Sequence, residues 1–150
     1  MKQGTKDLVG LLARLAVAGV FVYAGVLKLM APAEEFGYAI ETYRVLDSQL
    51  SLYVAYVLPW LELWVGLLLA AGVFTRVSAL ASGLMLAVFE AMLAQAWLRG
   101  LPVTSCGCFG SSHSHSLGHE FLQNLICLAL VWLAFGYGSR WSLDKYLEEL

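Results

Sequence analysis

Residues 52–73 read LYVAYVLPWLELWVGLLLAAGV, and this stretch decides the fold. Its one charged residue is Glu62. A helix of about 20 apolar residues is long enough to cross the hydrocarbon layer of a bilayer. After a tight turn at residues 74–76, a second apolar run follows at residues 77–98. The two runs therefore predict two membrane-spanning helices joined by a short turn.

Two further apolar runs lie outside this pair, at residues 8–30 and 121–137. Backbone polar groups inside lipid must be satisfied within their own segment, and these lengths suit helices rather than barrel strands. We therefore predict an all-α integral membrane protein, a four-helix transmembrane bundle formed by residues 1–150 as a single domain. The remaining connections, 31–51 and 99–120, are then two substantial loops on one side of the membrane.

The composition supports a membrane protein and excludes other classes. Of the 150 residues, 60% are hydrophobic and 13% are charged, and the mean hydropathy is +0.73. Soluble domains average roughly 45–50% apolar and about 25% charged residues. This composition excludes a disordered chain, and the net charge of -2 offers no basic surface for nucleic acid. We therefore expect contact with membrane lipid and no nucleic-acid partner.

The distribution of basic residues predicts the orientation. Alternate connections face opposite sides, so the N-terminus, the tight turn and the C-terminus share one side and the two long loops share the other. The first side carries Lys2, Lys6, Arg76, Arg140 and Lys145, and the second carries Lys28, Arg44 and Arg99. Because basic residues favour the cytoplasmic side, both termini are predicted in the cytoplasm and both loops outside.

The tail at residues 141–150 is predicted to form a short helix at the membrane interface. Ser142 can cap such a helix, and the aromatic side chains of Trp141 and Tyr146 suit the headgroup region. We assign this tail no chemistry.

Polar side chains within the spans are candidates for function because ionisable groups at membrane depth are costly. They are Arg14, Glu62 and Glu90, with Lys28 at an outer end and Asn124 about one turn into the last span. On the predicted topology, Lys28, Glu62, Glu90 and Asn124 converge on the outer half of the bundle. A structural interpretation competes: Arg14 and one glutamate could form a buried pair, or Glu90 could be protonated in an apolar setting.

The sequence SCGCFG at residues 105–110 is the most informative stretch of the second outer loop. Cys106 and Cys108 are separated by one glycine, so a disulfide between them closes a tight ring. Strained, exposed disulfides have more oxidising potentials. This pair is therefore better suited to thiol–disulfide exchange than to holding the loop together.

Three histidines follow the cysteine pair, at His113, His115 and His119. Together with Cys106 and Cys108 they offer enough ligands for zinc or copper, although their spacing matches no standard structural zinc site. They could instead tune a thiol or shuttle protons, or simply belong to a solvated loop. Cys127 stands alone in the last span, where a buried cysteine usually behaves as a small hydrophobic residue; a relay to the loop pair is the alternative.

Several segments together resemble the DoxX-like membrane proteins, and within them the branch related to the methylamine-utilisation protein MauE. The resembling residues are Arg14, AGVLKL at 24–29, Tyr43, LPWLEL at 58–63 with Gly66, and Arg99-Gly100 leading to CGCFG at 106–110. The resemblance covers nearly the whole chain, and its last motif is the most specific part.

This resemblance implies a four-span bundle in a bacterial or archaeal cytoplasmic membrane and a role in thiol redox chemistry. The MauE branch is associated with the maturation of disulfide-containing proteins outside the membrane, and other relatives with sulfur-compound oxidation coupled to quinone. Better-known quinone-linked disulfide generators carry two cysteine pairs, whereas this chain has one pair and Cys127. An internal relay between two pairs is therefore excluded, and exchange must be direct.

The preferred hypothesis is a membrane thiol–quinone oxidoreductase or maturation factor. Cys106 or Cys108 would exchange with an extracytoplasmic thioredoxin-like protein, and electrons would pass between this pair and a quinone. The residues expected to bind the quinone or carry its protons are Lys28, Glu62, Glu90 and Asn124. Two alternatives remain: a soft-metal binding or transport protein that uses the cysteines and histidines, and an accessory subunit whose polar residues hold a larger complex together.

Overall fold

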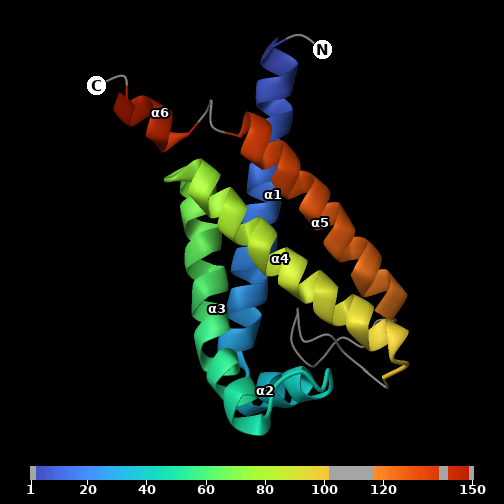
Figure 1. Cartoon of the computed structure of the whole chain (residues 1–150). Helices are drawn as coiled ribbons and strands as arrows, with labels where there is room; N and C mark the ends of the chain where they lie inside the picture. Colours follow the sequence, from blue (N-terminus) through green and yellow to red (C-terminus); the bar gives the residue numbers. More distant parts are fainter. Residues whose placement is uncertain (1–2, 102–116, 139–141, 149–150) are drawn as a thin grey trace.

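The chain folds into helices, as predicted. The computed structural model describes residues 3–101, 117–138 and 142–148, and among these there is no strand (Figure 1). Four of the helices are long and apolar enough to cross a membrane. They are α1 (Gln3–Met30), α3 (Ser48–Ala71), α4 (Thr75–Leu98) and α5 (Leu117–Tyr137). The all-α fold and the four membrane-spanning helices are thereby confirmed.

Capping residues set both limits of α3. Helix α3 begins at Ser48, before the run at residue 52, because the Asp47 carboxylate accepts a hydrogen bond from the Leu50 backbone N–H at 2.8 Å. It ends at Ala71 and is capped by Gly72, whose φ of 71° is a left-handed conformation that glycine adopts without strain. Helix α4 then starts at Thr75, so the turn between the two helices is as short as predicted.

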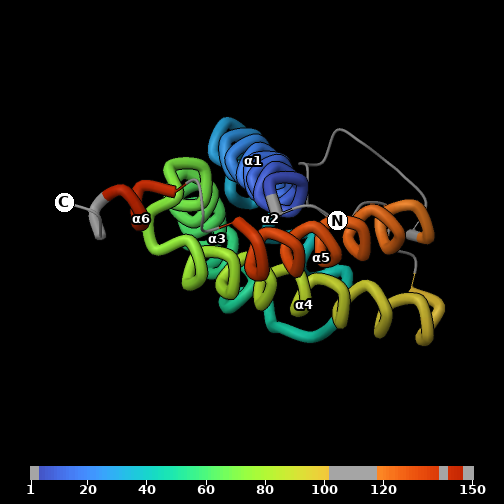
Figure 2. Tube along the Cα trace, turned by 90° about the horizontal axis from the view of Figure 1, so that it is seen from above, coloured from blue at the N-terminus to red at the C-terminus, as the bar shows by residue number. Residues whose placement is uncertain are grey.

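Helix α1 packs against α3 and α5, while α4 packs against α5 and α3 (Figures 1 and 2). The central core draws on all four helices and includes Val17 and Phe21 of α1, Leu69 of α3, Leu86 of α4 and Val131 of α5. Figure 1 shows α4 and α5 lying side by side and crossing the direction of α1 and α3 obliquely. The four helices thus form one bundle with a shared apolar interior.

Close contact between α1 and α3 depends on glycine. A Cβ atom at Gly25 would lie 2.9 Å from the Pro59 carbonyl oxygen and 3.0 Å from the Leu63 backbone nitrogen. At Gly66, on the facing helix, a Cβ atom would lie 2.9 Å from the Val22 side chain. Small residues let membrane helices approach closely where no hydrophobic effect drives their association. This approach brings the end of α1 beside the middle of α3.

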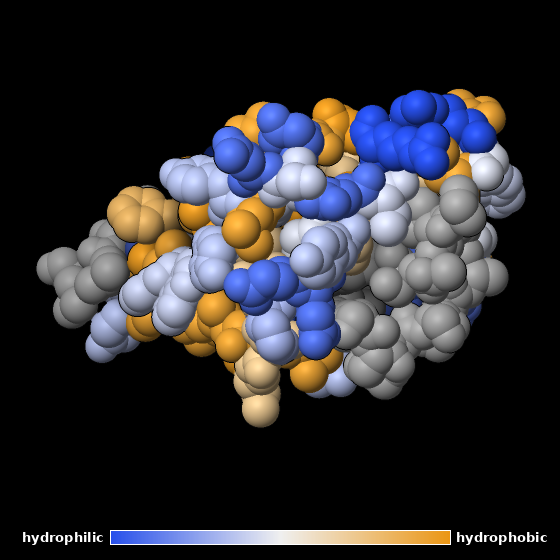
Figure 3. All heavy atoms as spheres, turned by 90° about the horizontal axis from the view of Figure 1, so that it is seen from below, coloured by the Kyte–Doolittle hydropathy of each residue, from blue (hydrophilic) through white to orange (hydrophobic). Residues whose placement is uncertain are grey.

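The two ends of the bundle differ. The start of α1, the turn between α3 and α4, and the tail lie at one end, which we call the tail end (Figure 1). The end of α1, the end of α4 and the start of α5 lie at the other, together with helix α2 (Ala33–Glu41); we call this the α2 end. Figure 3 shows the α2 end with hydrophilic side chains gathered between hydrophobic ones.

Helix α2 falls within residues 31–51, which the sequence predicts as a loop. It starts directly after Pro32, and its first turn carries Glu34 and Glu35, which suit the positive end of the helix dipole. Phe36 and Ile40 are buried and pack in a small core with Ala55 of α3. Helix α2 therefore covers the end of the bundle that lies beside the buried polar residues described below.

The tail forms α6 (Leu143–Glu148), which extends outward from the bundle beyond α3 (Figure 2). The Ser142 hydroxyl accepts a hydrogen bond from the Lys145 backbone N–H at 3.4 Å, which is the cap that the sequence predicts. The Asp144 carboxylate accepts hydrogen bonds from the backbone N–H groups of Phe74 and Thr75, both at 2.7 Å. Asp144 thus caps the start of α4 from the opposite end of the chain.

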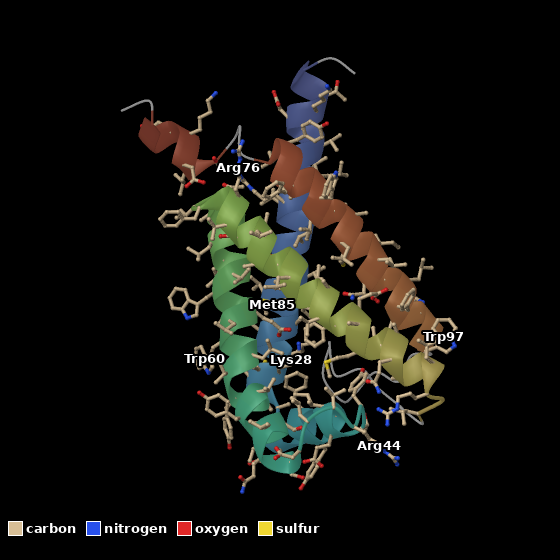
Figure 4. The ribbon with its side chains drawn as sticks, in the orientation of Figure 1. Lys28, Arg44, Trp60, Arg76, Met85 and Trp97 are labelled. Atoms are coloured by element: carbon tan, nitrogen blue, oxygen red, sulfur yellow. The ribbon has the colours of Figure 1, made fainter. Side chains whose placement is uncertain are left out.

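The outer surface of the helices is strongly apolar. The large exposed hydrophobic residues include Trp60 and Trp64 on α3, Leu80 and Leu84 on α4, and Trp132 on α5. Figure 4 shows Trp60 pointing away from the bundle. A water-soluble monomer rarely exposes so wide an apolar surface, whereas a bilayer covers it. The chain is therefore a multi-pass membrane protein.

Candidate functional site

A buried ion pair joins α1 and α3. The Lys28 ammonium donates hydrogen bonds to both carboxylate oxygens of Glu62, each at 2.7 Å, and the two side chains are 1% and 4% exposed. Lys28 lies in the last turn of α1, which the contact at Gly25 holds against α3. Each of these buried charges compensates the other, because either one alone in the protein interior would carry a large desolvation cost.

Two aromatic rings complete the surroundings of Lys28. Its ammonium nitrogen lies 5.1 Å from the ring centroid of Phe36 in α2 and 5.6 Å from that of Phe89 in α4. The face of an aromatic ring attracts a cation at such distances, most strongly where water is excluded. Figure 4 shows Lys28 between the helices rather than on the outer surface. Four helices therefore contribute to holding this one ammonium group.

A second polar pair joins α4 and α5. The Asn124 side-chain amide donates to Glu90 Oε2 at 2.7 Å and to the Leu86 carbonyl oxygen at 3.0 Å. The other carboxylate oxygen, Glu90 Oε1, is buried and accepts no hydrogen bond within the described part of the chain. The four predicted residues thus form two pairs, Lys28 with Glu62 and Glu90 with Asn124, rather than one cluster of four.

A small cavity of about 50 Å³ lies between α1, α3, α4 and α5. Its polar lining comes from Glu62 on α3 and from Glu120, Gln123 and Asn124 on α5, and Cys127 also borders it. Sequence reasoning missed Glu120 and Gln123. Their spacing from Asn124 and Cys127, at positions i, i+3, i+4 and i+7, puts all four on one helix face and could have identified them.

A larger, apolar groove of about 320 Å³ lies between α2, α3 and α4. It is lined by Ile40 and Tyr43, by Leu58 of α3, and by residues of α4 that include Leu84 and Val88, both exposed on the outer surface. Phe89 borders both the groove and the small cavity. The groove therefore opens toward lipid, and the Phe89 ring separates it from the polar interior.

The predicted cysteine site lies outside the described residues. Cys106 and Cys108 belong to residues 102–116, as do His113 and His115 of the metal alternative. His119 lies in the first turn of α5, and Cys127 is buried in the same helix. Among residues 3–101, 117–138 and 142–148, no three His, Cys, Asp or Glu side chains are grouped in a way that could hold a metal ion.

Arg14 belongs to the opposite half of the bundle. Its guanidinium donates to the Gly138 carbonyl oxygen at 2.9 Å and interacts with the Asp144 carboxylate. Partial burial on its own raises the pKa of Asp144, but the hydrogen bonds from Thr75 and Phe74 outweigh it, and with Arg14 they hold this pKa below its ordinary value. Arg14 thus helps to attach the tail and takes no part in the two polar pairs.

Comparison with known proteins gives a consistent result. Residues 6–137 match the model of the family described as Methylamine utilisation protein MauE. The chain is also 36% identical over 137 residues to the methylamine utilization protein MauE of Paracoccus denitrificans, an alignment that covers 91% of this chain and 73% of that protein. No solved structure matches the chain.

Proposed function

The chain belongs to the methylamine utilisation protein MauE family, and from this premise we propose that it is a membrane thiol–disulfide redox protein. Its task is the maturation of disulfide-containing proteins outside the membrane. The name of its relative indicates that these proteins serve methylamine utilisation. The observation that carries the proposal is the sequence CGC at residues 106–108, placed between two membrane helices. Cysteines so close together favour exchange over a structural crosslink.

The position of the flanking helices supports this role. The segment that carries Cys106 and Cys108 leaves α4 after Leu98 and enters α5 at Leu117, and both points lie at the α2 end (Figure 1). Lys28 and Glu120 lie toward the same end. The sulfur pair is therefore attached at the end of the bundle where buried ionisable groups gather.

The proposed chemistry is thiol–disulfide exchange with a thioredoxin-like partner. In the oxidising direction, a thiolate of the partner attacks the Cys106–Cys108 disulfide, and a mixed disulfide forms. The second thiolate of the partner then displaces the cysteine of this chain. The partner leaves with a disulfide, and Cys106 and Cys108 hold the two electrons and two protons as thiols.

A quinone is the proposed electron acceptor. When bound, it accepts two electrons and two protons. The cavity beside Glu62 is about 50 Å³, well below the roughly 150 Å³ of an apolar cavity that binds benzene, whereas the groove between α2, α3 and α4 is about 320 Å³. The groove would therefore be large enough for the ring, and Tyr43 and Phe89 in its lining would offer aromatic surfaces to it. Lys28, Glu62, Glu90 and Asn124, which form the two polar pairs of the interior, would carry the accompanying protons.

The proposal also fixes the location. We place the protein in the bacterial cytoplasmic membrane, with both termini in the cytoplasm and the α2 end outside, because the basic residues favour this orientation. An extracytoplasmic partner then meets Cys106 and Cys108 directly. Labelling with a membrane-impermeant maleimide after reduction with an impermeant phosphine tests this. Intact spheroplasts should react at Cys106 and Cys108, and an Arg76→Cys variant without the native cysteines should react only after lysis.

The activity is tested with purified protein in liposomes. The probes are a reduced thioredoxin-fold protein with a Cys-x-x-Cys motif and a short-chain benzoquinone, and quinone reduction is followed by absorbance. The double variant Cys106→Ser, Cys108→Ser should lose the activity, whereas Cys127→Ser, the matched control, should retain it. Full activity in the double variant would exclude the proposed mechanism.

The same variants distinguish the soft-metal alternative. Under the redox proposal, thiol labelling before and after reduction detects a reducible bond between Cys106 and Cys108. Under the alternative, the purified protein binds zinc or copper, and the double variant His113→Ala, His115→Ala loses the metal. Metal binding without a reducible disulfide would therefore replace the redox proposal.

A further inference from the structure

The small cavity between α1, α3, α4 and α5 has the properties of a water site. Its volume of about 50 Å³ exceeds the roughly 10–15 Å³ that one water molecule needs. A buried water also needs two to four polar partners. Glu62, Glu120, Gln123 and Asn124 all border the cavity and can supply them.

Two buried carboxylate oxygens beside this cavity call for such a partner. Glu90 Oε1 and Glu120 Oε2 are both shielded from solvent and accept no hydrogen bond within the described part of the chain. Glu120 borders the cavity directly, and Glu90 is hydrogen-bonded to Asn124, which borders it. A buried oxygen without a hydrogen-bond partner costs free energy in an apolar setting. Water in the cavity would donate to these oxygens and remove this desolvation cost.

The polar lining leads from the membrane interior to an aqueous surface. Glu62 lies near the middle of α3, whereas Glu120 lies in the first turn of α5, beside the exposed His119. Gln123 and Asn124 follow Glu120 on the face of α5 that borders the cavity, which Glu62 borders from α3. Residues 120 and 124 are one turn apart, about 6 Å along the helix, so a few water molecules can bridge the distance.

We propose that this cavity is hydrated and connects the Lys28–Glu62 pair with the aqueous phase at the α2 end, as a route for protons. The ionisable side chains that line it are Glu62 from α3 and Glu120 and Cys127 from α5. Two more are joined to its lining by hydrogen bonds: Lys28 to Glu62, and Glu90 to Asn124. On α2, the Phe36 ring faces the Lys28 ammonium. The purpose of the route rests on the proposed redox function, because quinone chemistry needs protons. The hydration itself does not depend on that function.

Cys127 offers a direct test of hydration, because it borders the cavity and its neighbour does not. Hydrogen peroxide is scarcely larger than water and oxidises a thiolate to a sulfenic acid, so the thiol must meet water and release its proton before it is modified. Cys127 is 8% exposed, whereas Ile126, at the same depth, is 55% exposed on the lipid-facing side. Simple exposure therefore predicts the opposite order of reactivity from a hydrated cavity.

The experiment uses the full chain in liposomes with Cys106→Ser and Cys108→Ser, so that Cys127 is its one cysteine. Its matched control carries Ile126→Cys and Cys127→Ser as well. We expect Cys127 to be modified at least tenfold faster than the cysteine at position 126. Equal rates, or a faster reaction at position 126, would overturn the proposal.

The route is tested by changing its polar lining. Glu120→Leu and Gln123→Leu should each slow the modification of Cys127 at least fivefold, while Glu35→Gln, on exposed α2, should leave it unchanged. Circular dichroism checks that each variant is folded. If one of the two is misfolded, the modification rate of the other still tests the route. Unchanged rates in a folded variant would show that water does not pass these residues. These variants lack Cys106 and Cys108, the two cysteines of the redox proposal. Failure of the redox proposal would therefore not change the rate at which Cys127 is modified.

Discussion

The Lys28 ammonium nitrogen lies 2.7 Å from both carboxylate oxygens of Glu62, and neither side chain has appreciable contact with solvent. The contact links the end of α1 to the middle of α3 at membrane depth. Because the charges compensate each other, the pair is tolerated only while both members are present. It therefore has two separable effects, one on stability and one on the chemistry of the site.

Removing one member of the pair should destabilise the protein strongly. Glu62→Gln leaves the Lys28 ammonium buried without its counter-ion, and we expect the free energy of unfolding to fall by roughly 3–5 kcal/mol. The double variant Lys28→Met, Glu62→Leu removes both charges and should recover most of this loss. Denaturant unfolding in detergent micelles, followed by circular dichroism, measures both. A double variant as unstable as Glu62→Gln would contradict this account.

Gly25 should be far less tolerant of substitution than Gly19, although both lie in α1. A Cβ atom at Gly25 would meet the backbone of Pro59 and Leu63, whereas at Gly19 no atom lies within 4 Å. Gly25→Ala should cost about 1–3 kcal/mol of stability through forced separation of the helices. Gly19→Ala should be neutral or stabilising by up to about 1 kcal/mol, because alanine favours the helix. Equal melting temperatures for the two variants would argue against close contact of α1 and α3.

Asn124 should contribute modestly to the association of α4 with α5. Its amide donates to Glu90 and to the Leu86 carbonyl, and hydrogen bonds between membrane helices average about 0.6 kcal/mol. We therefore expect Asn124→Ala to lower the free energy of unfolding by about 1 kcal/mol. A double-mutant cycle with Glu90→Ala, which removes the acceptor, isolates the side-chain pair. Strictly additive effects would mean that the two side chains do not interact.

Attachment of the tail should weaken in acid. The folded protein holds the pKa of Asp144 below its ordinary value of 3.8, so folding favours the ionised carboxylate. This contribution is fully present above that ordinary value, which the unfolded chain has, and is lost as the pH falls through the lower, folded value. Hydrogen exchange at the amides of Phe74 and Thr75 should be slow near pH 6 and should accelerate, relative to its intrinsic rate, below pH 4.

Asp144→Asn provides the comparison for the acid effect. The variant lacks the ionised carboxylate at every pH, so its Phe74 and Thr75 amides should exchange faster than those of the wild type near pH 6 and show little further dependence on acid. If the wild type and the variant gave the same protection near pH 6, the cap at α4 would not depend on the charge of Asp144.

The spans could be predicted from sequence because each is a continuous apolar run, which needs no knowledge of its neighbours. Their limits could not, because they depend on caps such as Asp47 and Gly72. Helix α2 was missed for a related reason. It is short, and Phe36 and Ile40 stabilise it by packing on Ala55, a tertiary contact that no local pattern reveals.

The candidate site was predicted in part. Polar side chains are costly at membrane depth, and this identified Lys28, Glu62, Glu90 and Asn124 as candidates. It could not predict which of them would pair, because pairing depends on how the helices cross. Glu120 had been assigned to a loop, since α5 begins four residues before the apolar run at 121. The contact of Asp144 with Thr75 joins positions far apart in the chain, and no spacing rule predicts it.

The cap at the start of α4 has a consequence for biosynthesis. The ribosome completes α4 long before Asp144 is made, so the amides of Phe74 and Thr75 must bind water or lipid headgroups in the interval. Only when the last few residues have been translated does the start of α4 receive its permanent acceptor. A nascent chain stopped before residue 144 therefore carries all four apolar helices but leaves the hairpin of α3 and α4 unsecured on the side where the tail attaches.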